Sequence, residues 1–190
     1  VFTATDENFH PDLENMRNSI TSKTRCILIN SPNNPTGAVY TPEEIQSVVD
    51  LAVEHDLWII SDEIYARLVW SEWSHVSPAS LQGGKDRTLV VTGFSKSFAM
   101  TGWRLGAAIG PAKIIEQINR LNVNMESCTT HFVQYAGLAG LHAPKEETQY
   151  ILNILKKRRN VLIEILNEIE GIECFVPKLS LIHISEPTRP

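Results

Sequence analysis

The sequence predicts an α/β fold with three layers, in which a mostly parallel sheet is flanked by helices and followed by one long helix. Two observations predict this fold. Four short apolar runs lack the polar and apolar alternation of half-exposed strands, which is typical of strands buried in a parallel sheet. Helical patterns lie between and after these runs, and strands that alternate with helices favour parallel pairing.

The predicted strands are the apolar runs at residues 25–30, 57–61, 88–92 and 105–109. The first run ends at residues 31–37, a dense cluster of proline, asparagine, serine and glycine that typically forms a loop. We therefore expect a buried strand with a sharp end, followed directly by a structured loop.

The first predicted helix follows that loop. Thr41 is a typical N-cap, Pro42 suits the first helical position, and Glu44 at the third position completes a capping box. The helix is expected to reach about Glu54. Its buried face is expected to contain Ile45, Val48, Val49 and Ala52.

Beyond Pro111 the apolar pattern becomes helical. Two short helices are predicted from apolar stripes, one of Ile114, Ile115, Ile118 and Leu121, the other of Val133, Ala136, Leu138 and Leu141. A long helix from about residue 145 to 169 has an apolar face of Ile151, Ile154, Leu155, Val161, Leu162, Ile165 and Leu166. Its basic residues 156–159 are expected on the solvent side, and the helix is expected to link two parts of a domain.

Composition narrows the class of protein. A chain of 190 residues with 43% hydrophobic content can bury a sizeable core. A net charge of −5 and a pI of about 5.7 give no basic surface for nucleic acid, so small metabolites are the expected ligands. The N-terminal residues do not resemble a secretory signal, and no apolar run could span a bilayer. We expect a cytoplasmic protein without membrane association.

The three cysteines indicate neither a disulfide framework nor a metal site. Cys26, Cys128 and Cys174 are far apart in the sequence and include no C-x-x-C pair. An odd number of separated cysteines fits a reduced compartment.

Residues 179–190 differ from the rest of the chain, because they follow neither a helical nor a strand period. They resemble one translated reading frame of an adapter used in sequencing libraries. We therefore expect a non-native tail, with a natural loop and edge strand as the alternative.

Candidate chemistry lies after the predicted strands, where open α/β sheets bind their ligands. Lys96 lies between an apolar strand and a helix start, with Arg104 eight positions later. This pair suits an amine bonded to an aldehyde cofactor and a guanidinium that binds its phosphate. Asp62 can keep a ring nitrogen protonated, Tyr65 can reach the same ring, and Asn34 can donate to a phenolate oxygen. Together these residues would surround a pyridoxal ring.

Each of these residues also has an ordinary structural interpretation. A lone lysine is usually a solvated surface group, and an aspartate such as Asp62 is often an N-cap. The segment that contains Asn34 forms a good turn, and Tyr65 can be a core aromatic. Their order after successive strands favours the functional interpretation.

Three motifs resemble those of the pyridoxal-phosphate-dependent aminotransferases of class I and II, whose fold is called type I. They are NSPNNPTG at residues 30–37, SDEIY at residues 61–65, and the run at residues 93–106 that begins GFSK. The third resembles the lysine-attachment signature of the family. The resemblance covers essentially residues 1–178 in the order that the family shows.

The resemblance implies a role for each matching residue. Lys96 is expected to be catalytic, to hold pyridoxal 5'-phosphate as an internal aldimine and, once displaced by substrate, to act as a general base. Asp62 is expected to face the pyridinium nitrogen. Asn34 and Tyr65 are expected to bind the ring oxygen.

The phosphate ligands are implied less completely. Arg104 matches the arginine that binds the phosphate. Some family members also have a serine three residues before the lysine, where this chain has Gly93, so Ser95 is the weaker substitute. No metal is implied.

The resemblance also implies that the chain is a fragment. The upstream phosphate loop, the aromatic that stacks on the ring and the downstream arginine for the substrate carboxylate have no match. Residues 1–144 are expected to form part of the cofactor-binding large domain, and residues 145–178 the long helix and the start of a small domain. Without those groups we expect weak catalysis or none, because the substrate would not be oriented.

The implied reaction is the transfer of an amino group between an amino acid and a 2-oxo acid, with a homodimer at full length. The same fold also hosts carbon–sulfur lyases and related synthases, and the ligand-sensing domains of cofactor-binding transcription regulators. These remain alternatives, and no residue indicates which amino acid is used.

Overall fold

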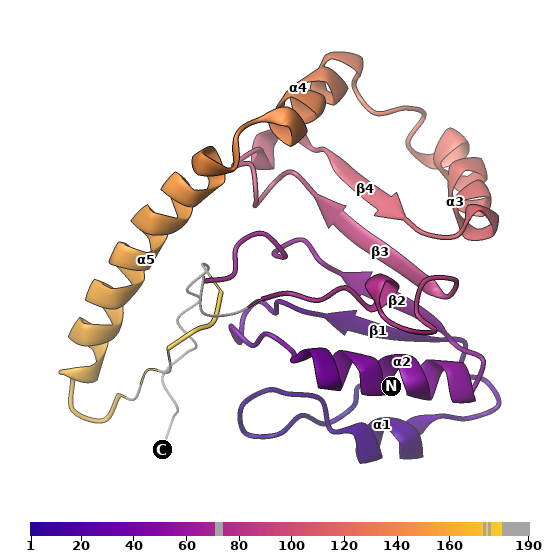
Figure 1. Cartoon of the computed structure of the whole chain (residues 1–190), viewed down its shortest axis with the longest axis horizontal. Helices are drawn as coiled ribbons and strands as arrows, with labels where there is room; N and C mark the ends of the chain where they lie inside the picture. The colour runs from indigo at the N-terminus through magenta and orange to yellow at the C-terminus, as the bar shows by residue number, and fades with distance from the viewer. Residues whose placement is uncertain (71–73, 173, 175, 180–190) are drawn as a thin grey trace.

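The computed structural model describes residues 1–70, 74–172, 174 and 176–179 (Figure 1). Its sheet contains, in spatial order, β1 (Cys26–Asn30), β2 (Trp58–Asp62), β3 (Thr88–Gly93) and β4 (Gly106–Ile109). β1, β2 and β3 pair in parallel, and β4 pairs antiparallel with β3. The strand boundaries lie within one residue of those predicted, and the mostly parallel sheet flanked by helices is confirmed.

The helices of the described residues are α1 (Leu13–Ser19), α2 (Pro42–Glu54), α3 (Ala112–Met125), α4 (His131–His142) and α5 (Lys145–Asn167). Two short 3₁₀ turns, Pro78–Ser80 and Thr101–Trp103, precede β3 and β4 respectively. None of these helices is both long and apolar enough to cross a membrane.

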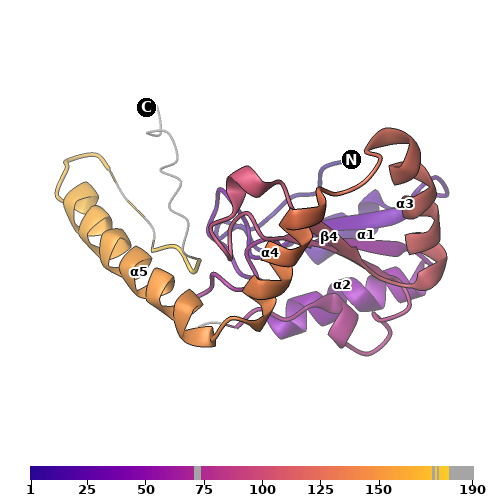
Figure 2. The same cartoon turned by 90° about the horizontal axis from the view of Figure 1, so that it is seen from above.

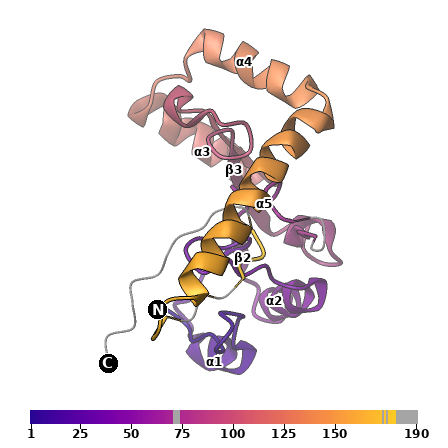
Figure 3. The ribbon, with the colours of Figure 1, turned by 90° about the vertical axis from the view of Figure 1, so that its left-hand side faces the viewer.

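The main core lies between the sheet and the pair α1 and α2, which lie beside each other in Figures 1 and 3. The four residues predicted for the inner face of α2 are each at most 1% exposed. Neighbouring residues of a strand point to opposite faces, so Ile29 is buried in this core while Leu28 is 68% exposed. The packed face of the sheet is therefore the one that α1 and α2 cover.

The predicted capping box of α2 is confirmed. Oγ1 of Thr41 accepts a hydrogen bond from the Glu44 N–H at 3.2 Å, and Oε2 of Glu44 accepts one from the Thr41 N–H at 2.7 Å. The helix consequently begins at the predicted residue.

α1 was not predicted from the sequence. Oδ1 of Asp12 accepts from the Asn15 N–H at 2.9 Å and caps this helix, and Met16 anchors it in the core. The signal was present in the N-cap and in the helical spacing of Leu13, Met16 and Ile20, but it spans only two turns.

α5 contacts the rest of the chain differently from the prediction. The expectation that residues 156–159 all face solvent is wrong for Arg159, which is 8% exposed. Its guanidinium carbon lies 4.5 Å from the centroid of the Trp70 ring, and Nη1 donates to the Pro177 carbonyl at 3.3 Å. Val161 and Ile165, expected on the buried face, are more than half exposed.

The reason is the position of α5. Figure 2 shows this helix projecting from the body of the molecule instead of lying along the sheet. It packs on the segments that contain Trp70 and Pro177, so only a narrow stripe is covered. On α3 and α4, Leu121, Leu138 and Leu141 of the predicted stripes are likewise at least half exposed.

Leu179, the first residue of the segment expected to be a non-native tail, is fully buried. It pairs with Val69 and packs with Tyr65 and Leu68. The remaining residues of that segment, 180–190, lie outside the described residues, so the origin of the segment stays a prediction.

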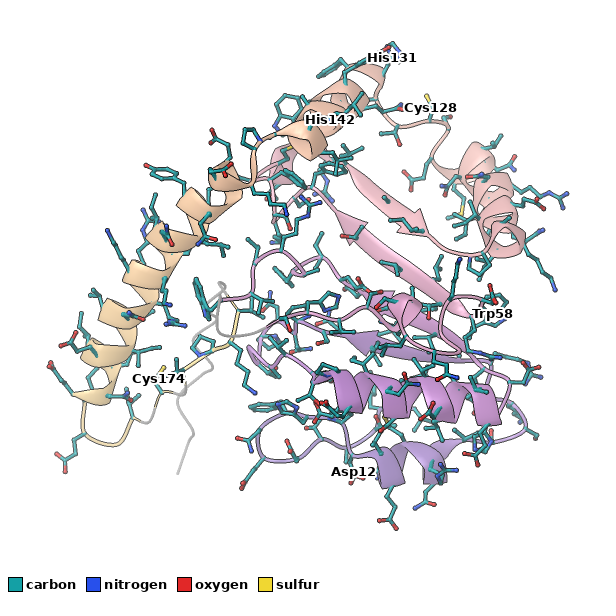
Figure 4. All side chains as sticks on the ribbon, viewed as in Figure 1. Asp12, Trp58, Cys128, His131, His142 and Cys174 are labelled. Carbon is teal, nitrogen blue, oxygen red and sulfur yellow. The ribbon has the colours of Figure 1, made fainter. Side chains whose placement is uncertain are left out.

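The cysteines are not joined by disulfides. Figure 4 shows Cys128 in the connection between α3 and α4, and Cys174 beyond the end of α5. These two thiols therefore lie in separate parts of the molecule.

Candidate active site

The residues predicted to act together come from one edge of the sheet. Asp62, the last residue of β2, pairs with Asn30, the last residue of β1, and with a residue near the end of β3. Asn34 follows β1, Tyr65 follows β2 and Lys96 follows β3. The parallel register therefore places all three loops at the carboxyl ends of the strands.

Asn34 lies in a loop that is held by internal hydrogen bonds. Oδ1 of Asn33 accepts from the N–H and the hydroxyl of Thr36, at 3.2 and 2.7 Å. The Gly37 N–H donates to the Asn33 carbonyl at 3.0 Å, with a φ of +76° that favours glycine. From this loop, Nδ2 of Asn34 donates to Oη of Tyr65 at 2.9 Å.

Tyr65 is held in a turn after β2. The Glu63 carbonyl accepts from the Ala66 N–H at 3.0 Å, and the Tyr65 carbonyl accepts from the Leu68 N–H at 2.8 Å. The side chain is 5% exposed and packs with Leu68. Tyr65 is thus a core aromatic whose hydroxyl is also bound at the strand ends.

Lys96 lies in the turn after β3 and is half-buried. Its carbonyl accepts from the Ala99 N–H at 3.3 Å. Its Nζ lies 5.9 Å from the centroid of the Tyr65 ring, within the range of a cation–π contact. The structure therefore brings Asn34, Tyr65 and Lys96 together.

Asp62 is half-buried at the end of β2. One carboxylate oxygen accepts a hydrogen bond from the Ile64 N–H at 3.2 Å, which orients the side chain. Within the described residues, this carboxylate forms no hydrogen bond or ion pair with Lys96 or Tyr65.

Ser95 and Arg104 are joined through Thr101. The Ser95 carbonyl accepts from the Thr101 hydroxyl at 2.9 Å, and Nη1 of Arg104 donates to the Thr101 carbonyl at 3.0 Å. Arg104 is exposed and has a left-handed backbone with a φ of +54°, a conformation that non-glycine residues adopt mainly at functional sites and turns. In the described part of the chain, neither side chain is hydrogen-bonded to Lys96 or Tyr65.

Glu63 is a buried residue beside the site that the sequence did not indicate. Its Oε1 accepts from the hydroxyls of Ser61 and Ser77 at 3.0 and 2.6 Å. Its Oε2 lies 3.0 Å from Nε2 of His75. The only sequence signal was an acidic residue directly after the strand, with a serine two positions earlier.

The environment of Glu63 favours the charged carboxylate. Burial alone would raise the pKa of Glu63, but His75, Ser77 and Ser61 together outweigh burial and lower the pKa below its ordinary value. We expect an ionised, buried carboxylate directly after Asp62.

The fold and the site define a class: an α/β domain whose parallel strands end at a half-buried amine, beside a tyrosine and an asparagine. The chain belongs to the aminotransferase class I and II family, whose model matches residues 1–189.

The curated relatives of this chain are named as aminotransferases. The chain is 42% identical to an aspartate aminotransferase of Musicola paradisiaca, over 84% of this chain and 40% of the relative. It is 38% identical to aromatic-amino-acid aminotransferase 2 of Thermococcus litoralis, over 94% of this chain and 46% of the relative. The chain thus spans less than half the length of either relative.

Solved structures give the same result. An aromatic aminotransferase from Pyrococcus horikoshii matches with a TM-score of 0.87 and 38% identity, over 93% of this chain and 48% of that chain. The aspartate aminotransferase of Rhizobium meliloti matches with a TM-score of 0.86 and 34% identity, over 90% of this chain and 43% of that chain. These likenesses support the type I fold that the motifs implied.

Proposed function

We propose that this chain forms the cofactor-binding part of an enzyme that transfers an amino group between an amino acid and a 2-oxo acid. The names of its relatives support this reaction over a lyase, a synthase or a transcription regulator. The observation that carries the proposal is the grouping of Lys96 with the hydrogen-bonded pair Asn34 and Tyr65 at the strand ends.

Family members depend on pyridoxal phosphate, and the groups at the strand ends fit it. The phenol of Tyr65 and the amide of Asn34 are neutral groups suited to a phenolic oxygen. The carboxylate of Asp62 suits a protonated ring nitrogen, and the guanidinium of Arg104 suits a phosphate. Bound pyridoxal phosphate supplies an electrophilic carbon and a ring that accepts electrons.

The protein groups have distinct proposed tasks. Nζ of Lys96 binds the cofactor covalently and, when released, moves a proton from the Cα of the substrate. Asp62 keeps a proton on the ring nitrogen. Nδ2 of Asn34 already donates to Oη of Tyr65, so the phenol's own hydrogen is available to the cofactor's oxygen. Arg104, with Ser95 as a weaker ligand, binds the phosphate.

We also propose that the full-length protein acts in the cytoplasm as a homodimer. Large apolar side chains are exposed between the middle of α3 and the start of α4. This exposure supports the proposal that a second subunit covers that region. The exposed side chains are Leu121, Val123, Met125 and Phe132.

The covalent role of Lys96 can be tested with the chain itself. Added pyridoxal phosphate is expected to give the visible absorption band of the lysine-bound cofactor, and Lys96→Ala is expected to abolish it. Borohydride reduction followed by peptide mass mapping should place the label on Lys96. Lys113→Ala, which removes an exposed lysine of α3, is the matched control and should keep the band. An unchanged band in Lys96→Ala would exclude the proposed role.

A further inference from the structure

Glu63 has no task in the chemistry above, although its buried carboxylate lies beside the site. Its side chain, 9% exposed, contacts Ser61 near the end of β2, and His75 and Ser77 further along the chain. The three contacts occupy both carboxylate oxygens. They tie the end of β2 to the segment at residues 75–77.

The main chain of Glu63 is fixed as well. Its N–H donates to the Val91 carbonyl of β3 at 2.8 Å. Its carbonyl accepts from the Ala66 N–H at 3.0 Å and from the Thr92 hydroxyl at 3.5 Å. The turn that carries Tyr65 therefore begins at a residue held by both its main chain and its side chain.

The alternation of the strand relates this arrangement to Asp62. Ser61 and Glu63 point to one face, and Asp62 points to the other. Because both neighbours of Asp62 are anchored on the opposite face, its peptide units cannot rotate without breaking buried hydrogen bonds. The backbone that carries Asp62 is thereby fixed, and its carboxylate accepts a hydrogen bond from the Ile64 N–H on the same turn.

We propose that Glu63 is a positioning residue, whose buried side-chain contacts fix the orientation in which Asp62 and Tyr65 meet the cofactor. This inference rests on the proposed function. Its basis is geometry: a glutamine has the same length and still accepts from Ser61 and Ser77, whereas an aspartate keeps the charge but is too short to reach them.

The test is a titration of the complete 190-residue chain with pyridoxal phosphate. The absorbance of the visible band measures how much cofactor is bound. Glu63→Ala and Glu63→Asp are expected to weaken binding about tenfold and to displace the pH midpoint of the band. Glu63→Gln is expected to stay within about twofold of the unmodified chain. Val49→Ala, in the core of α2 away from the strand ends, is the matched control: it should lower stability but change neither quantity.

The outcomes separate this inference from the proposed function. If Glu63→Ala does not fold, Ser61→Ala removes one contact and should shift both quantities in the same direction by less. Glu63 and Ser61 variants that behave like Val49→Ala would overturn the inference, as would an aspartate variant that binds better than the glutamine variant. If the unmodified chain shows no band that depends on Lys96, the proposed function itself fails, whatever Glu63 does.

Discussion

At the scale of single residues, Tyr65 connects the core with the proposed site. Its ring packs with Leu68 and Leu179, while its hydroxyl accepts from Asn34 and its face lies near the amine of Lys96. A ring held by core packing is a rigid support for the polar groups around it. The geometry of the site therefore depends on apolar contacts that have no chemical task.

The lowered pKa of Glu63 predicts a contribution to acid stability. As the pH falls, the carboxyl of the unfolded chain binds its proton first, near its ordinary pKa of about 4.3. The contribution to stability is therefore complete above that pH and is lost as the pH falls through the lower pKa of the folded state. Glu63→Gln should lose less unfolding free energy than the unmodified chain between about pH 6 and about pH 3.

Urea unfolding at several pH values measures this difference. The matched control is Glu43→Gln, which changes an exposed glutamate in the first turn of α2. Equal pH dependence in the Glu63→Gln variant and the unmodified chain would contradict the prediction.

The grouping of Asn34, Tyr65 and Lys96 could be predicted from the sequence, because the carboxyl ends of parallel strands share one edge. The contacts of Glu63 could not. His75 and Ser77 lie in a loop without periodicity, and only the folded path of that loop brings them to the end of β2.

At the scale of elements, the capping box of α2 has a second connection. Glu44 caps the helix through Thr41, and both of its carboxylate oxygens lie 2.8 Å from Nδ1 of His10. The start of the helix is thus joined to the N-terminal segment. A local sequence motif accounts for the cap, but nothing in it predicted the partnership with His10.

Removing the N-cap hydroxyl should destabilise the protein. Thr41→Ala is expected to lower the free energy of unfolding by about 1 kcal/mol, because the Glu44 N–H loses its acceptor. Ser47→Ala, in the interior of the same helix, is the matched control and should be neutral or slightly stabilising. Urea denaturation measures both variants, and equal effects would show that the cap contributes nothing.

Helix boundaries could be predicted more easily than helix faces. The start of α5 was predicted correctly, but the charged run at residues 156–159 concealed the burial of Arg159. A guanidinium can be buried when an aromatic face and carbonyl groups surround it, and Trp70 and Pro177 are distant in sequence. Periodicity contains no information about such partners.

At the scale of the whole molecule, α5 is attached through Arg159. Arg159→Met should remove the contact with Trp70 and the hydrogen bond to Pro177, and weaken the attachment by about 1–3 kcal/mol. Hydrogen exchange of residues 145–167 is expected to accelerate. The matched control is Arg158→Met, which removes the exposed neighbouring arginine. Equal exchange in both variants would contradict the anchoring role.

The segment at residues 177–179 joins elements from the whole chain. The Lys178 N–H donates to the Gly37 carbonyl at 3.1 Å, and the Trp70 N–H donates to the Lys178 carbonyl at 3.3 Å. Packing is tight, because a Cβ added at Gly37 would lie 2.6 Å from Cβ of Pro177. The loop that carries Asn34 is thus completed by residues near the other end of the described chain.

This arrangement has a consequence for the order in which the chain folds during its synthesis. His10 and Lys178 are in contact across 168 positions, which a ribosome needs about ten seconds or more to traverse. Helices form in microseconds, so α1 and α2 have ample time to form before residue 178 is synthesised. The Asn34 loop would therefore make its contacts with residues 177 and 178 late, after most of the chain has been synthesised.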